Sequence, residues 1–493
     1  MSRPGRHHAG RRASHPAAGG RARRRLRARG DRRGVALVMV LGAITVLTVF
    51  LTELQEETST ELSAALADRD ALRAEYYAKS AVNLSRMLIA AEPSVSTALG
   101  PMLGMMGMKN IQVPVWKFTD MFLGPFNAQL VEPGVEPPPA PAGEGSAAGK
   151  NLGLTGGGRF ELKVVDEGSK ININRAADDV AVSDQLIVGG QLSGLIAPEQ
   201  YNPLFEERDG DGQFSDRMTI CSALVDWADP GDQTFNCDFK MEAPSSTGAE
   251  DSFYQTVGLP YLRKNAPYDS VEELRLVRGM SDDFWATFVD PEPSNPDKRV
   301  LTVWGSRKQK TNVISASAQT LWALTCNDNV VDRPATPLCT DPNQMASFLT
   351  VTSLVQSLTG GLLFPTVKEF EIAMTQKEDK SSVLGTMIGQ QLKAMGVEPV
   401  KFRAKPSSFL GNRSSFLSIY ADGIVPGNKR ETRVRIHAVV DLTGAGKLEE
   451  VKPDPNELSR PGSNGAVSPA TPDAYEQQVR SNPAGTIVYY RIE

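Results

Sequence analysis

Residues 35–52 constrain the fold most, because they form a run of eighteen residues without a charged side chain. As a helix, this run would extend about 27 Å at about 1.5 Å per residue, which nearly spans the hydrocarbon core of a bilayer. From residue 53 to residue 91 neither proline nor glycine interrupts the chain. We therefore predict one continuous helix over residues 35–91, apolar in its first third and amphipathic beyond it.

Charge is divided unevenly along the chain. Residues 1–34 contain twelve arginines and one aspartate, a net charge of +11 against −5 for the whole chain, so the remainder carries −16. Arginine-rich arms can bind nucleic acid, but an arm beside an apolar helix usually fixes membrane orientation and stays cytoplasmic. We favour the second interpretation. A secretory signal peptide fits less well, because no small-x-small cleavage site follows the apolar run.

The four cysteines form two local pairs, Cys221 with Cys237 and Cys326 with Cys339. No CxxC motif or Cys/His spacing typical of zinc is present. We predict two local disulfides, which require an oxidising compartment. Buried free thiols are the alternative.

Two acidic clusters are candidates for binding calcium, which prefers oxygen ligands. The first is a glycine-containing loop with Asp209, Asp211, Gln213 and Asp216, and the second contains Asp226, Asp229 and Asp232. Phenylalanine and isoleucine stand where an EF-hand needs its glycine and its bidentate glutamate, so the first cluster is not an EF-hand. An intervening helix would make the clusters separate sites. Alternatively, these aspartates are ordinary turn and helix-end residues.

No pattern of catalytic residues stands out. His437, the one histidine beyond the basic arm, lies in a predicted strand, where a lone histidine is usually structural or exposed. The glycine-rich residues 153–160 lack the lysine and helix of a phosphate-binding loop. We therefore do not expect an enzyme, although a membrane-anchored periplasmic hydrolase is one alternative.

A helical hairpin is predicted over residues 265–288, with Asp269 or Ser270 as the cap of its first helix. It resembles the helix-hairpin-helix that grips DNA phosphates in other proteins. Asp282 and Asp283 follow its glycine, where a phosphate binder would need cations. A DNA-binding pilin-like protein is therefore a further alternative that we do not favour.

The leader resembles that of type IV pilins and pseudopilins, in which a prepilin peptidase cuts after a glycine that precedes an apolar helix. By this resemblance the cut follows Gly34 and frees Val35, whose amine is then methylated. The family usually has phenylalanine first and glutamate at the fifth mature position, where this chain has Val35 and Met39. The glutamate is thought to pair with the amine of a neighbouring subunit. A subunit that lacks this glutamate does not need a neighbouring subunit above it. Such a subunit is suited to the tip of a filament.

Several short sequence motifs also resemble those of the protein K family, which are minor pseudopilins of type II secretion. DEGSKININRA (residues 166–176) matches that family's first asparagine-rich signature, and TNVISASA (311–318) its second. LVDWADPGD and KNAPYDSVEELRLVRGM match two phrases of its inserted domain. The resemblance implies an α+β pseudopilin fold, in which a long helix packs on an antiparallel sheet and a large helical domain is inserted between strands.

The domain organisation that we expect combines this resemblance with the chain's patterns. Strand-like alternation predicts strands near 416–426, 431–442 and 486–493. The expected segments are a leader (1–34), the helix (35–91), a Gly/Pro/Met-rich linker (92–157), a first strand region (158–175), an inserted helical domain (176–295), a return to the pseudopilin core (296–325), a second helical segment (326–405) and the final strands (406–493).

The resemblance also implies partners and a location. Members of this family join the I and J minor pseudopilins at the pseudopilus tip, start its assembly for export of folded proteins across the outer membrane, and bind calcium in the inserted domain. We accordingly expect an inner-membrane protein with a single span, a cytoplasmic amino terminus and a periplasmic bulk. We expect no nucleic acid partner.

Overall fold

The structure is a computed structural model that describes residues 32–105, 112–119, 158–177, 182–206, 215–237, 251–306, 308, 310–427, 431–445 and 482–493. The chain divides into two compact units, residues 1–67 and 68–493. The helix α1 contributes to both.

Helix α1 spans Arg32–Met105 and therefore runs beyond the end predicted near residue 91. It contains Pro93 and Pro101, although proline in a helix interior removes a hydrogen bond. A contact outside the helix holds this last part: the backbone N–H of Val113 donates to Ser96 Oγ at 3.0 Å. Residues 92–105 are thus helix rather than the predicted linker. Of the rest of that linker, 106–111 and 120–157 lie outside the described residues.

The first part of α1 fits the predicted membrane span. Within the described residues, one helix is long and apolar enough to cross a membrane, and it is the part of α1 that begins at Val35. The side chains of its apolar run are exposed in the isolated chain.

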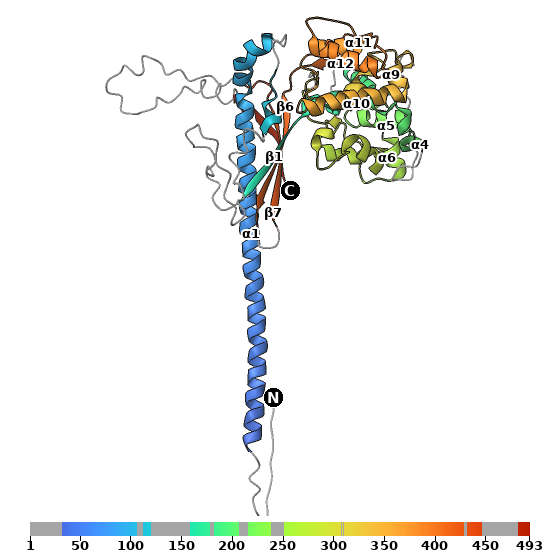
Figure 1. The fold of residues 1–493 in the computed structure, drawn as a ribbon. Helices are drawn as coiled ribbons and strands as arrows, with labels where there is room; N and C mark the ends of the chain where they lie inside the picture. The colour runs from blue at the N-terminus through green and yellow to red at the C-terminus, as the bar shows by residue number, and fades with distance from the viewer. Residues whose placement is uncertain are drawn as a thin grey trace, which may run out of the picture. The chain divides into compact units, whose positions relative to one another are not determined.

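Four strands form one antiparallel sheet. They are β1 (Arg159–Asp166), β6 (Phe416–Val425), β7 (Thr432–Asp441) and β8 (Thr486–Ile492), in the order β1-β6-β7-β8. The three strands predicted after residue 415 are thus confirmed. The chain leaves the sheet after β1 and returns at β6, so a large domain is inserted between two paired strands. Figure 1 shows β1, β6 and β7 alongside α1.

One face of the sheet packs on α1 through small residues. Ala74 and Ala78 of α1 are completely buried, and a Cβ atom at Gly423 of β6 would lie 1.8 Å from the carbonyl oxygen of Ala74. Glycine at this position therefore allows the helix and strand backbones to approach closely. Phe160, Ile419 and Ile436 complete the core under α1.

The inserted domain is mostly helical, as predicted, and its helices gather in one group (Figure 1). The helices are α3 (Val182–Ile196), α4 (Pro203–Glu206), α5 (Arg217–Asp226), α6 (Ser252–Val257), α7 (Asp282–Phe284), α8 (Ala318–Thr325), α9 (Pro337–Thr340), α10 (Pro342–Leu358), α11 (Val367–Thr375) and α12 (Val383–Ala394). Their shared core includes Leu192, Trp322 and Phe348.

Residues 296–325 do not return to the pseudopilin sheet, so that prediction is wrong. The short strand β3 (Leu301–Thr302) pairs with β2 (Ile171–Asn172), and β4 (Thr311–Asn312) pairs with β5 (Leu410–Gly411), both in parallel. Helix α8 packs in the helical core. The prediction rested on the motif in residues 311–318, and local sequence does not show which core buries residues such as Val313 and Leu321.

The predicted hairpin is present in altered form. Its first helix is the 3-10 helix η6 (Val271–Leu276), preceded by Ser270, whose side chain makes no capping bond. Asp269 donates its backbone N–H to Glu273 Oε2 instead. Gly279 joins the two helices at a φ of +80°, a conformation that glycine adopts without strain.

Candidate functional site

The predicted processing and assembly residues lie at the start of α1. The structure places Gly34 inside the helix, which begins at Arg32. Val35 and Met39 follow on the apolar run, and their side chains are 61% and 71% exposed. Nothing in the described chain covers these positions, so they are accessible to a membrane, a protease or another subunit.

Both predicted disulfide pairs are joined in the structure. Cys221 on α5 bonds to Cys237 across sixteen residues, and Cys326 at the end of α8 bonds to Cys339 on α9 across thirteen. Each bond fixes a loop of the helical domain onto a helix of its core.

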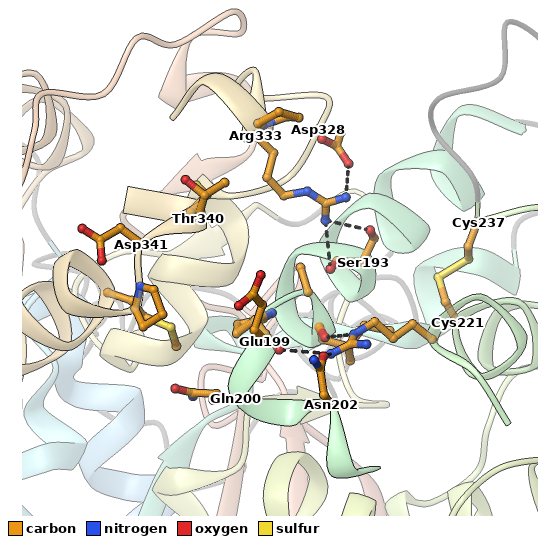
Figure 2. Close-up of a pocket in the computed structure, with 18 of the residues that line it drawn as sticks. Ser193, Glu199, Gln200, Asn202, Cys221, Cys237, Asp328, Arg333, Thr340 and Asp341 are labelled. Carbon is orange, nitrogen blue, oxygen red and sulfur yellow. Dashed lines mark hydrogen bonds and ion pairs between the residues drawn. A yellow bond between two sulfur atoms is a disulfide. The ribbon is translucent and has the colours of Figure 1, made fainter. Parts of the chain in front are cut away.

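A cavity of about 710 Å³ opens between these two disulfides. It is lined by the end of α3 and the following turn, by α5, by the loop before α9, and by the start of α10. Figure 2 shows Glu199 and Gln200 at this cavity, with the disulfide of Cys221 and Cys237 beside it.

The arginines of the cavity hold its walls together. Arg333 bonds to Asp328 at 2.9 Å and donates to the carbonyl oxygen of Ser193, and Arg217 donates to the carbonyl oxygen of Ile196 at 2.7 Å. Among the described residues that line the cavity there is no histidine, and the lining cysteines are joined in disulfides.

The first acidic cluster is only partly described. Asp209, Asp211 and Gln213 lie outside the described residues. Asp216 caps α5, since its Oδ1 accepts the backbone N–H of Thr219 at 2.7 Å. Its carboxylate thereby satisfies an N–H group that has no partner within the helix.

The second acidic cluster separates into a buried pair and an exposed residue. Asp226 and Asp229 are 6% and 8% exposed, whereas the Asp232 side chain is 93% exposed and bonds to Arg263 at 3.0 Å. Burial raises the pKa of Asp226 to about 8, and the charge of Asp229 adds to this rise. Among the described residues, no group of three acidic, histidine or cysteine side chains could hold a metal ion.

Residues of the sequence motifs contact one another inside the fold. Asn174 donates to the carbonyl oxygens of Tyr268 and Val303 and accepts the N–H of Tyr268. Trp227 donates its indole N–H to Glu273 at 2.9 Å. These hydrogen bonds therefore connect the motifs around residues 174, 227 and 268 within one core. The sequence alone did not reveal this structural role.

A buried polar network joins the sheet to the helical domain, and sequence reasoning missed it. The side chains of Glu167 and Lys170 are each 3% exposed and bond at 2.9 Å. Asp166, at the end of β1, accepts a hydrogen bond from Asn312 at 2.8 Å and another from Ser315. The signal available in the sequence was the set of charged residues Asp166, Glu167 and Lys170 beside apolar residues in the first asparagine-rich motif.

His437 lies beside this network on the sheet face opposite α1. Its ring stacks on Tyr420 with the centroids 4.2 Å apart and contacts Tyr489 edge-on. Burial lowers the pKa of His437 to about 4, which the charge of Glu167 opposes and that of Arg299 reinforces. The histidine is structural, as its position in a strand suggested.

The architecture defines the class of protein. A long amino-terminal helix packed on an antiparallel sheet, with a helical domain inserted between strands, is the α+β pseudopilin fold that the sequence resemblance implied.

The comparisons with known proteins agree with this class. Residues 169–288 match the family model described as "Type II secretion system (T2SS), protein K". This match over part of the inserted domain agrees with the resemblance that the sequence motifs indicated.

One solved structure is also similar to this chain. The crystal structure of the GspK-GspI-GspJ complex from the enterotoxigenic Escherichia coli type 2 secretion system is similar with a TM-score of 0.33 and 12% identity, over 68% of this chain and 80% of that chain. The comparison with curated proteins found no match.

Proposed function

We propose that this protein is the minor pseudopilin at the tip of a type II secretion pseudopilus, where it starts assembly together with I and J minor pseudopilins. The observation that carries the proposal is the family match over the inserted domain, residues 169–288, in a chain with a pseudopilin fold. By its size and position in the chain, the insertion is the feature that distinguishes this chain from a simple helix-and-sheet pseudopilin.

Two features of the chain support a place at the tip. The inserted domain adds more than two hundred residues between β1 and β6, and such bulk would obstruct a further subunit above it. Met39 provides no carboxylate for the amine of such a subunit. A buried carboxylate in a bilayer costs several kcal/mol unless it is paired, so its absence suits a subunit with no neighbour above.

We further propose that a prepilin peptidase cuts between Gly34 and Val35 and that the new amine is methylated. The basic arm would remain in the cytoplasm and the unit from residue 68 onward would lie in the periplasm. Mass spectrometry of the membrane-extracted protein tests this: a mature chain beginning at Val35 is expected. A chain that retains the arm would contradict it.

Co-purification tests the tip assignment. The full-length chain, co-expressed with the I and J subunits of the same secretion system, is expected to be recovered in one detergent-stable complex with both. A variant in which the I subunit is omitted serves as the control for nonspecific capture of J. Recovery of this chain alone would count against the assignment.

We also propose that the helical domain binds calcium, with the buried carboxylates of Asp226 and Asp229 among the ligands. Two buried carboxylates this close in the chain fit a hard divalent cation, which would stabilise the charged form of Asp226 that burial disfavours. Asp232 does not fit, because it points to Arg263 and to solvent.

The calcium proposal predicts a ligand-dependent stability. Millimolar calcium should raise the thermal midpoint relative to a chelator, because an ion that binds only the folded state stabilises it. Asp226→Asn should abolish this rise, whereas Asp282→Asn, at a side chain 93% exposed, should retain it. An unchanged wild-type midpoint would reject the proposal.

A further inference from the structure

The cavity between the two disulfides is large enough to hold a ligand. Its volume of about 710 Å³ lies within the range of about 300–1,000 Å³ that is common for ligand-binding pockets. Cys221, Cys237 and Cys339 line it, so both disulfides lie at its walls. Walls that are fixed by covalent bonds need little ordering when a ligand enters, which favours binding.

Most charged side chains of the cavity are already occupied by partners within its walls. Arg333 bonds to Asp328 at 2.9 Å. Arg403 bonds to Asp332 at 2.6 Å. The third arginine of the lining, Arg217, donates its N–H groups to two main-chain carbonyl oxygens of the wall. The three guanidinium groups therefore hold the walls together rather than wait for an anion.

Two carboxylates of the cavity have no cation beside them. Among the described residues, neither Glu199 nor Asp341 makes an ion pair. Asp341 caps α10, because its Oδ1 accepts the backbone N–H of Asn343 at 2.9 Å. Glu199 is exposed, and Figure 2 shows its side chain between Asp341 and Arg333. The cavity thus presents a negative charge to whatever enters it.

Much of the remaining lining is apolar. Pro198, Pro334 and Pro342 lie in the walls together with Met218 and Met345. Proline has no backbone N–H to donate, and methionine adapts its shape to a neighbour. An aliphatic chain can lie along such a surface while its charged end reaches a carboxylate. Arginine and lysine side chains combine these two parts, an apolar stem and a cationic head.

We propose that this cavity binds an arginine or lysine side chain of an extended polypeptide segment, and that Glu199 receives its cationic head. Gln200 and Thr340 are exposed at the same cavity, where their amide and hydroxyl groups are available to the main chain of the segment. A metal cation fits less well, because prolines and methionines provide no side-chain oxygen ligands. This inference goes beyond the proposed tip function and depends only on the lining of the cavity.

A peptide array tests the preference for a cation. The labelled, detergent-solubilised full-length chain is applied to pentapeptides of random sequence whose central residue is arginine, lysine, citrulline or glutamate. Citrulline has the shape of arginine without its charge. We expect the arginine and lysine peptides to retain at least tenfold more protein than the citrulline and glutamate peptides. Equal retention on arginine and citrulline peptides would overturn the inference.

Two variants separate the cavity from a general attraction of basic peptides to an acidic chain. Glu199→Gln removes an exposed carboxylate, so the fold is kept, and retention on arginine peptides should fall at least fivefold. The matched control is Glu378→Gln, at an exposed carboxylate after α11 that does not line the cavity, and it should leave retention unchanged. An equal loss in both variants, or a loss in neither, contradicts the assignment to this cavity.

Cross-linking in living cells identifies the source of the bound segment. Photoreactive benzoylphenylalanine in place of Gln200 should form an adduct with a segment that contains arginine or lysine. An adduct with an exported protein and an adduct with another secretion subunit would each support the inference, and each names its source. An adduct confined to this chain, or to a segment without a basic residue, would overturn it.

Discussion

At the scale of single residues, the charges buried between the sheet and the helical domain set the stability of the junction. Burial alone would raise the pKa of Glu167, but Lys170 and the hydroxyl of Thr302 outweigh it and lower the pKa. The ion pair is therefore charged inside the protein, and its strength depends on both partners being present.

Removing one partner of this pair should be costly. Lys170→Met leaves the Glu167 carboxylate buried without its cation, so we expect a loss of about 3–5 kcal/mol in the free energy of unfolding. The double variant Glu167→Gln with Lys170→Met should recover part of this loss, because no charge is then buried alone. Chemical denaturation of the detergent-solubilised chain measures both. Equal stability of Lys170→Met and wild type would show that the pair is unimportant.

His437 gives the protein a pH-dependent stability. Its pKa is about 4 in the folded chain and about 6.5 when unfolded, so the unfolded state binds the proton first as the pH falls. Stability from this group is complete above pH 6.5 and decreases as the pH falls towards 4, by about 3 kcal/mol in total.

The variant His437→Phe isolates this effect, since it keeps an aromatic ring against Tyr420 but cannot be protonated. The difference in thermal midpoint between pH 7 and pH 4.5 should be smaller in the variant than in wild type. Identical differences in the two proteins would assign the pH dependence to other groups.

At the scale of elements, the contact of α1 with β6 depends on one glycine. In Gly423→Ala the new Cβ would lie 1.8 Å from the Ala74 carbonyl oxygen, so the helix must shift away from the sheet. We expect a loss of about 1–3 kcal/mol in stability, as for other overpacked cores. Gly100→Ala, in the same helix with no atom within 4 Å of the new Cβ, is the control. A normal thermal midpoint for Gly423→Ala would contradict the close packing.

The elements themselves were predicted to different degrees. Alternating side chains predicted β6, β7 and β8, because one face of each strand packs on a core. The end of α1 was missed, since Pro93 and Pro101 read as helix breakers while the contact of Ser96 with residue 113 is not visible in sequence.

At the scale of the whole molecule, the inserted domain and the missing carboxylate give separate reasons for the proposed place at the tip. Met39→Glu distinguishes them. We expect little additional incorporation of this variant along the filament, because the inserted domain would still obstruct a subunit above it. Immunogold labelling or quantification of this chain in sheared pseudopili measures incorporation. Strong labelling along the shaft would mean that the missing carboxylate alone restricts the protein to the tip.

The sequence by itself determined the local features: the apolar span, the basic arm, the cysteine pairs and the phrases of the protein K family. Each depends on residues close together in the chain, where periodicity and spacing are sufficient. Only the tertiary structure decided that residues 296–325 belong to the helical core, and that Asp226 and Asp229 are buried while Asp232 is not. These depend on contacts between distant segments, because burial of a side chain is set by what packs against it rather than by its neighbours in sequence.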